Sequence, residues 1–139
     1  MKLFFRVFLL ALPRFIILMV ILIGLNQIDF SPLPAWTMLV IAYLAHFVVT
    51  YFFANWAFHK HRPNMKQALL VGGTFIIWGS MLEALLFIVL QGGRTNHLWD
   101  NYHWQSLYIV ALYILAVAFS AYHMRRHYVK TELAEGLES

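Results

Sequence analysis

The stretch that decides the fold is QALLVGGTFIIWGSMLEALLFIVL, residues 67–90, in which Glu83 is the only charged residue. A helix needs about 20 apolar residues to cross the roughly 30 Å hydrocarbon core of a bilayer. This stretch exceeds that length, and it therefore predicts a transmembrane helix with one carboxylate inside it.

Three other apolar runs have the same character, at residues 3–28, 35–58 and 104–122. Polar segments rich in proline, glycine or charge separate the four runs: NQIDFSPLPAW, HKHRPNMK and QGGRTNHLWDNYHW. We therefore predict an all-α polytopic membrane protein with four transmembrane helices arranged as two hairpins. They form a single domain over residues 1–130, followed by a short, frayed tail over residues 131–139.

The composition agrees with a protein that lies in lipid. Of the 139 residues, 62% are hydrophobic and 12% are charged, which is about half the charged share of an ordinary soluble domain. There are no cysteines, so disulfide frameworks, thiolate metal sites and cysteine nucleophiles are excluded. The net charge is +4, but the basic residues lie beside apolar runs. This is the membrane pattern, and we expect no nucleic-acid partner.

The positions of lysine and arginine predict the orientation. Nine of the ten lie before or early in the first run, between the second and third, or after the fourth; Arg94 is the exception. We expect both termini and the middle loop to be cytoplasmic, in a bacterial inner membrane. Lys2, Arg6 and Arg14 share a third of a helical turn, so residues 1–12 are predicted to lie along the interface before Pro13 turns the chain inward.

Glu83 is expected to face other helices or water, because a lone carboxylate in hydrocarbon costs about 2.5–3.5 kcal/mol on insertion scales. Gly72, Ile76, Gly79 and Glu83 follow one another at helical spacing, with Ser80 alongside. Small residues let a second helix approach closely. We therefore assign Gly72, Gly79 and Ser80 to helix packing, and we place Glu83 on the packed face.

Depth in the membrane predicts the neighbours of Glu83. The equivalent level is near Tyr43 in the second run and near Tyr113 in the fourth, and His46 lies one turn from Tyr43. We predict a buried cluster of Glu83, His46, Tyr43 and Tyr113, with His46 or Tyr43 within hydrogen-bond reach of Glu83. Such a cluster either locks helices together, binds a cation or carries a proton, or meets a partner subunit.

Histidines and basic residues gather at the predicted cytoplasmic surface. Two pairs with metal-ligand character are His59 with His61 and His123 with His127, and the opposite side carries His97, Asp100 and His103. Interfacial histidines more often lie among lipid headgroups, so no cofactor is expected. The residues expected to contact anionic headgroups are Arg125, Arg126, Lys60 and Arg62.

The layout resembles the GtrA-like family of small four-helix inner-membrane proteins. The likeness rests on LLVGG at residues 69–73, which opens the third run, and on NWAF at residues 55–58, which closes the second. It covers the chain only as a hydropathy pattern. The asparagine–arginine pair of the family's helix ends is missing here, since Asn55 directly precedes Trp56. No functional residue is transferred on this basis.

Three classes of function follow from these features. The first is a small transporter or flippase that works through the Glu83–His46 site, with membrane lipids and copies of itself as partners. The second is a non-catalytic subunit of a larger membrane complex, in which Glu83 docks another chain. The third is a lipid- or metal-handling enzyme that uses the cytoplasmic histidines. No catalytic motif occurs in the chain, so an enzyme is not expected.

Overall fold

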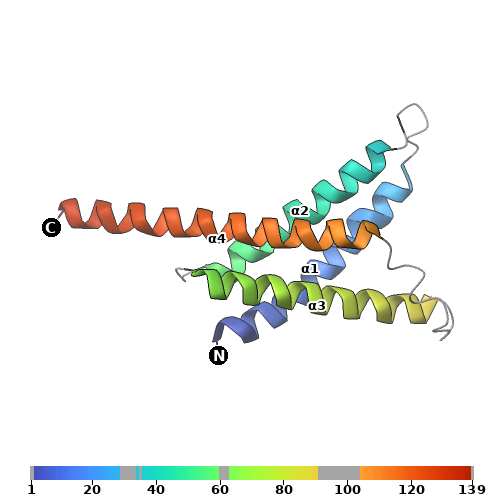
Figure 1. Cartoon of the computed structure of the whole chain (residues 1–139), viewed down its shortest axis with the longest axis horizontal. Helices are drawn as coiled ribbons and strands as arrows, with labels where there is room; N and C mark the ends of the chain where they lie inside the picture. Colours follow the sequence, from blue (N-terminus) through green and yellow to red (C-terminus); the bar gives the residue numbers. More distant parts are fainter. Residues whose placement is uncertain (1, 29–33, 35, 60–62, 91–103, 139) are drawn as a thin grey trace.

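The computed structural model describes residues 2–28, 34, 36–59, 63–90 and 104–138, and within these ranges the regular structure is entirely helical. The helices are α1 (Lys2–Asn26), α2 (Trp36–Phe58), α3 (Met65–Leu90) and α4 (Trp104–Glu138) (Figure 1). Each of the four contains a segment that is long enough and apolar enough to cross a membrane. The predicted fold class is confirmed at this level.

The first turn of α3 begins at a capping box, which explains why this helix starts two residues before its predicted position. The Gln67 amide donates to Asn64 Oδ1 at 2.8 Å, and the Asn64 amide donates to Gln67 Oε1 at 3.0 Å. Each side chain thereby satisfies an amide that has no partner within the helix. The helix start is thus fixed by two polar side chains rather than by the first apolar residue.

Helix α4 is much longer than predicted. The fourth apolar run was expected to end near residue 122, whereas α4 contains 35 residues and continues to Glu138. At 1.5 Å per residue such a helix is about 52 Å long, which exceeds the roughly 30 Å bilayer core. Figure 1 shows its C-terminal part projecting beyond the other three helices. The predicted frayed tail is therefore a direct continuation of α4.

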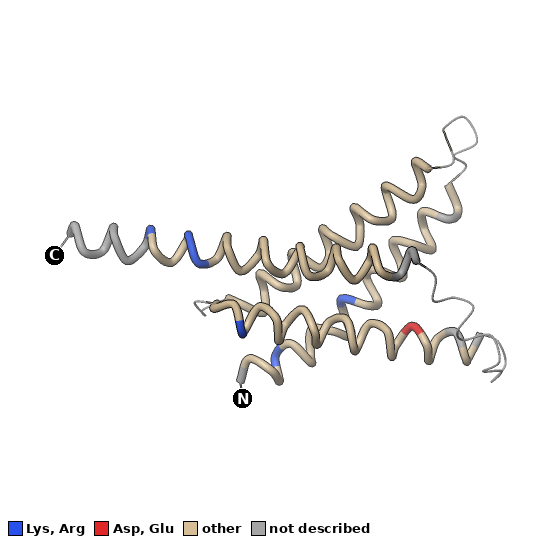
Figure 2. Tube along the Cα trace, viewed as in Figure 1, with Lys and Arg blue, Asp and Glu red and all other residues tan. Residues whose placement is uncertain are grey.

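The four helices pack through the pairs α1–α2, α1–α3, α3–α4 and α2–α4, the last being the most extensive. We call the end that holds the starts of α1 and α3 and the end of α2 the basic end, and the opposite end the far end. Apart from Arg14 at the middle of α1, the described Lys and Arg positions gather toward the basic end in Figure 2, and the acidic position drawn there lies on α3, nearer the far end. Toward the far end, α2 diverges from α3 and α4 (Figure 1).

The core closes the basic end of the bundle. Val7, Ala57, Phe58 and Val71 are each 0% exposed and belong to one cluster contributed by α1, α2 and α3. An edge-to-face contact between the Phe8 and Trp78 rings, with centroids 4.5 Å apart, joins α1 to α3 beside it. Side chains therefore fill the space between the helices from the basic end to about the middle of the bundle.

Helix α1 corrects the prediction for the first residues of the chain. Pro13 lies inside a helix that runs without interruption from Lys2 to Asn26, so residues 2–12 are the first half of α1 and no turn separates them from the rest. A proline removes one backbone hydrogen bond but need not end a helix whose neighbours hold it in place. The consequence is that Arg14 lies at mid-helix, away from the basic end.

Candidate functional site

Arg14 is the residue around which the middle of the bundle is organised. Its side chain is 0% exposed. Nη1 donates to Thr50 Oγ1 on α2 at 3.0 Å, and Nη2 donates to the Phe75 carbonyl on α3 at 3.1 Å. One guanidinium thus connects three helices, and the assignment of Arg14 to the cytoplasmic interface was wrong.

Two aromatic rings enclose the same guanidinium. Its Cζ lies 4.9 Å from the centroid of the Phe75 ring and 4.5 Å from that of the Tyr113 ring. Contacts of this kind are worth about 2 kcal/mol or more when the cation is desolvated. The Nε atom of Arg14 has no hydrogen-bond acceptor, and the residue forms no ion pair with any side chain that the structure describes. Among the described residues, the groups that contact this charge are all neutral.

Gly79 provides the space that the guanidinium occupies. A Cβ atom at this position would lie 2.9 Å from Arg14 Nη2, closer than real Cβ contacts allow. Gly79 therefore serves helix packing in a specific way: because it has no side chain, the Arg14 guanidinium fits against α3 at this position. At Gly72 an added Cβ would meet Val117 of α4 at 3.9 Å, which is ordinary van der Waals distance between packed helices.

His46 and Tyr113 form a buried pair next to Arg14. His46 is 8% exposed and Tyr113 is 6% exposed, and 3.0 Å separates His46 Nδ1 from the Tyr113 hydroxyl oxygen. The pair connects α2 to α4 at the depth where the sequence places both residues. Because the Tyr113 ring also covers Arg14, the pair and the cation share one side chain.

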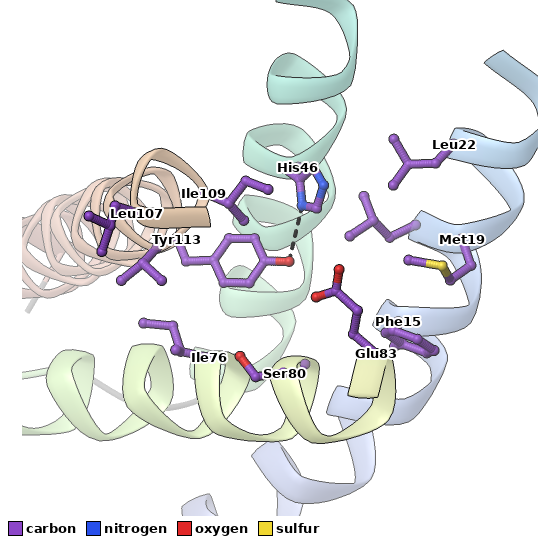
Figure 3. Close-up of a pocket in the computed structure, with 13 residues that line it drawn as sticks. Phe15, Met19, Leu22, His46, Ile76, Ser80, Glu83, Leu107, Ile109 and Tyr113 are labelled. Carbon is purple, nitrogen blue, oxygen red and sulfur yellow. Dashed lines mark hydrogen bonds between the residues drawn. The ribbon is translucent and has the colours of Figure 1, made fainter. Parts of the chain in front are cut away.

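A cavity of about 550 Å³ begins at this pair (Figure 3). Its lining residues lie from the middle of the helices toward the far end. Three helices line it with four residues each, and α2 adds His46. The lining residues are Phe15, Leu18, Met19 and Leu22 from α1; Ile76, Gly79, Ser80 and Glu83 from α3; and Leu107, Ile109, Val110 and Tyr113 from α4. The α1 wall is wholly apolar, and the polar groups come from the other three helices.

Glu83 lines this cavity, and its carboxylate points into it on the side of His46 and the Tyr113 hydroxyl (Figure 3). The expected hydrogen bond to His46 or Tyr43 is absent: within the described part of the chain Glu83 makes no hydrogen bond or ion pair. Its side chain is exposed rather than buried. Glu83 thus faces an open cavity and has room to accept a partner.

Of two further residues predicted near Glu83, one lines the cavity and the other does not. Ser80 lines the cavity as well as lying beside the small-residue stripe. Tyr43 is partly buried but does not line the cavity. Depth alone placed it near Glu83, whereas Figure 1 shows α2 diverging from α3 toward the end where Tyr43 lies.

The alternative of an inner metal site is not tested in full, because His61 lies outside the described residues. No group of three potential metal ligands occurs among the described residues. His123 Nδ1 lies 3.2 Å from the Tyr51 hydroxyl, and the His59 carbonyl accepts from Arg6 Nη1 at 3.0 Å. Lys60, His61, Arg62, His97, Asp100 and His103 lie outside the described residues.

The two described arginines of the predicted headgroup set behave as surface residues. Arg125 and Arg126 are exposed on α4, and the Arg126 guanidinium lies over the Tyr122 ring, 4.9 Å from its centroid. Both positions leave the positive charge available to the surroundings. Their contact with anionic lipid stays a prediction.

Comparison with protein-family models, with curated proteins and with solved structures finds no match to this chain. The GtrA-like layout is therefore a likeness of hydropathy only.

Proposed function

We propose that this protein is a small membrane transporter of the flippase type, which carries an amphipathic molecule by way of the cavity and a protonatable Glu83–His46 site. The single observation that carries the proposal is the cavity itself, which brings Glu83, His46 and Tyr113 from three helices together within the membrane-spanning segments. Polar groups so far inside a bilayer are costly to maintain. Their convergence on an empty space favours a binding role over helix packing alone.

The asymmetry of the bundle supports transport rather than simple binding. The cavity occupies the half nearer the far end, while the cluster around Val7, Phe58 and Val71 closes the basic end. A carrier that alternates its access has such a form when it is open to one side only. A second conformation, open at the basic end, completes the cycle.

The proposed orientation assigns the two sides. With the basic end on the cytoplasmic face of a bacterial inner membrane, as the lysine and arginine distribution favours, both termini are cytoplasmic and the helices form two hairpins. The cavity then opens toward the outer leaflet. A pathway of only four helices favours assembly of several copies.

Transport can be tested with three probes that share an octyl chain and differ in charge: octanesulfonate, octyltrimethylammonium and an octyl sulfobetaine. The protein is reconstituted into vesicles that contain a pH dye, and uptake of each probe is measured together with internal pH. We expect at least one probe to enter faster than in protein-free vesicles, with a change in pH that Glu83→Gln abolishes. The matched control is Glu135→Gln in the C-terminal part of α4.

Two results would contradict the proposal. One is that no probe enters faster than in protein-free vesicles. The other is that Glu83→Gln transports the probe and changes the internal pH as the wild type does.

One observation favours a second candidate, an accessory subunit of a larger membrane complex. Glu83 is exposed and has no partner within the described residues, as a docking residue would be. Native mass spectrometry of gently extracted wild type and Glu83→Gln separates the two functions. A homo-oligomer in both samples favours the transporter, whereas other membrane proteins that co-purify with the wild type alone favour the subunit.

A further inference from the structure

The charges inside the bundle are few and can be counted. Arg14 is the only buried lysine or arginine among the described residues, and Glu83 is the only carboxylate among the described side chains. Arg14 touches Gly79, and Glu83 follows Gly79 by four residues on the same helix. One turn of α3, a rise of about 6 Å, therefore separates the two levels.

The charge of Arg14 is fixed, whereas that of Glu83 can change by protonation. An arginine guanidinium keeps its proton under all conditions that proteins meet, whereas a carboxylate can gain one. The other titratable groups at the cavity are His46 from α2 and Tyr113 from α4, and the α1 wall contributes none. The positive charge of Arg14 is thus a fixed property of the site, and the charge of Glu83 is adjustable.

A fixed buried cation that forms no ion pair with a described side chain selects the sign of what binds beside it once Glu83 is neutral. A cationic ligand would be repelled by Arg14 in a medium that screens poorly, and an anionic one would be attracted. Tyr113 lies between the cation and the cavity, since Arg14 covers its ring and its hydroxyl pairs with His46. The Tyr113 hydroxyl can donate to an anionic oxygen when His46 Nδ1 donates to it, and the α1 wall of Phe15, Leu18 and Met19 suits an alkyl chain.

We propose that the cavity binds an amphipathic anion, with its head near Tyr113 and its tail against α1, and that Glu83 gains one proton when the anion enters. This inference rests on the proposed function and names its substrate class. With Glu83 ionised, Arg14 and Glu83 sum to zero. An added anion leaves one uncompensated negative charge, and a proton taken from water onto the Glu83 carboxylate restores the balance. Each anion therefore enters with one proton.

Titration calorimetry of the protein in nanodiscs tests both parts, with octanesulfonate as the probe and two buffers of different ionisation enthalpy. The difference between the buffers gives the number of protons taken up. We expect about one proton per octanesulfonate for the wild type. Glu83→Gln should bind at least as tightly with no proton uptake, and His46→Asn should still take up the proton.

Arg14→Met tests the role of the cation, because methionine keeps an apolar side chain of similar length without a charge. We expect octanesulfonate binding to weaken at least tenfold, while Arg14→Lys, which keeps the charge, retains most of it. Thermal unfolding shows whether each variant is folded. If Arg14→Met is not, the proton count of the wild type and of Glu83→Gln still decides the inference.

Octyltrimethylammonium provides the opposing control. The inference is overturned if it binds more tightly than octanesulfonate, if octanesulfonate does not bind at millimolar concentration, or if the anion binds without proton uptake. The proposed function survives any of these results if vesicles show that another probe is transported and that this transport depends on Glu83. The two hypotheses therefore fail separately.

Discussion

Arg14 shows how a charged residue can be retained in the middle of an apolar bundle. Hydrogen bonds from a charged donor are worth about 1.5–3 kcal/mol each, and Arg14 makes two of them. Inserting an arginine at the centre of a helix costs about 2.5–3.5 kcal/mol. The free energy of these two hydrogen bonds is thus comparable to the cost of inserting the arginine. The cation–π contacts with the rings of Phe75 and Tyr113 stabilise the guanidinium further.

Gly79→Ala should displace the Arg14 guanidinium. The new Cβ would lie 2.9 Å from Nη2, and the atom that has to move is held by the Phe75 carbonyl. Overpacking of this kind costs about 1–3 kcal/mol, which unfolding in mixed micelles can measure. Gly73→Ala is the matched control on the same helix, since an added Cβ there has nothing within 4 Å. Equal stability of the two variants would contradict the close contact.

Tyr113→Phe removes the hydroxyl that pairs with His46 and keeps the ring over Arg14. Interhelical hydrogen bonds in membranes average about 0.6 kcal/mol, so we expect a small loss of stability. The free imidazole of His46 should then exchange its ring protons faster, as nitrogen NMR of labelled histidine can show. Tyr108→Phe is the control, because Tyr108 is 62% exposed. An unchanged His46 spectrum in Tyr113→Phe would rule out the pair.

At the scale of the elements, run length and breaks in the sequence predicted most of what the structure shows. The first three helices begin and end within about two residues of the apolar runs. The fourth does not, because the tail after residue 122 is charged and hydropathy marks only where lipid ends. The backbone hydrogen bonds of a helix are local, so a helix can extend beyond its apolar run, and α4 extends to Glu138.

The candidate site was predicted only in part, for reasons of geometry. Membrane depth brought His46, Tyr113 and Glu83 to one level, and all three line the cavity. Depth does not tell how helices diverge, and Tyr43 does not line the cavity. Arg14 was missed because an arginine early in an apolar run resembles an interfacial anchor and Pro13 resembles a turn. One feature of the sequence could have revealed its buried position: Arg14 lies near the centre of the apolar Leu3–Leu25 span.

Asn64→Ala should loosen the start of α3. Loss of an N-cap side chain costs about 0.5–2 kcal/mol, and here it also releases Gln67 from the capping box. We expect faster hydrogen exchange over the first turn of α3 and little change near Glu83. Met65→Ala is a suitable control, because Met65 is 73% exposed and next in sequence. Fast exchange along all of α3 would show that the cap has a global role instead.

For the molecule as a whole, the orientation proposed from the lysine and arginine distribution can be tested readily, because the chain contains no cysteine. Single cysteines at Met65, at the basic end, and at Gln27, at the far end, lie at exposed positions. A membrane-impermeant maleimide should label Gln27→Cys in intact cells, and it should label Met65→Cys only after the cells are opened. The reverse pattern would place the cavity opening on the cytoplasmic side.

The contacts of Arg14 also set an order of events during synthesis. Its hydrogen-bond partners come 36 and 61 residues later in the chain. At roughly 5–20 residues per second, the Phe75 carbonyl is made about 3–12 s after Arg14. During that interval Arg14 lacks this acceptor. The full set of Arg14 hydrogen bonds can therefore form only after this part of α3 has been made.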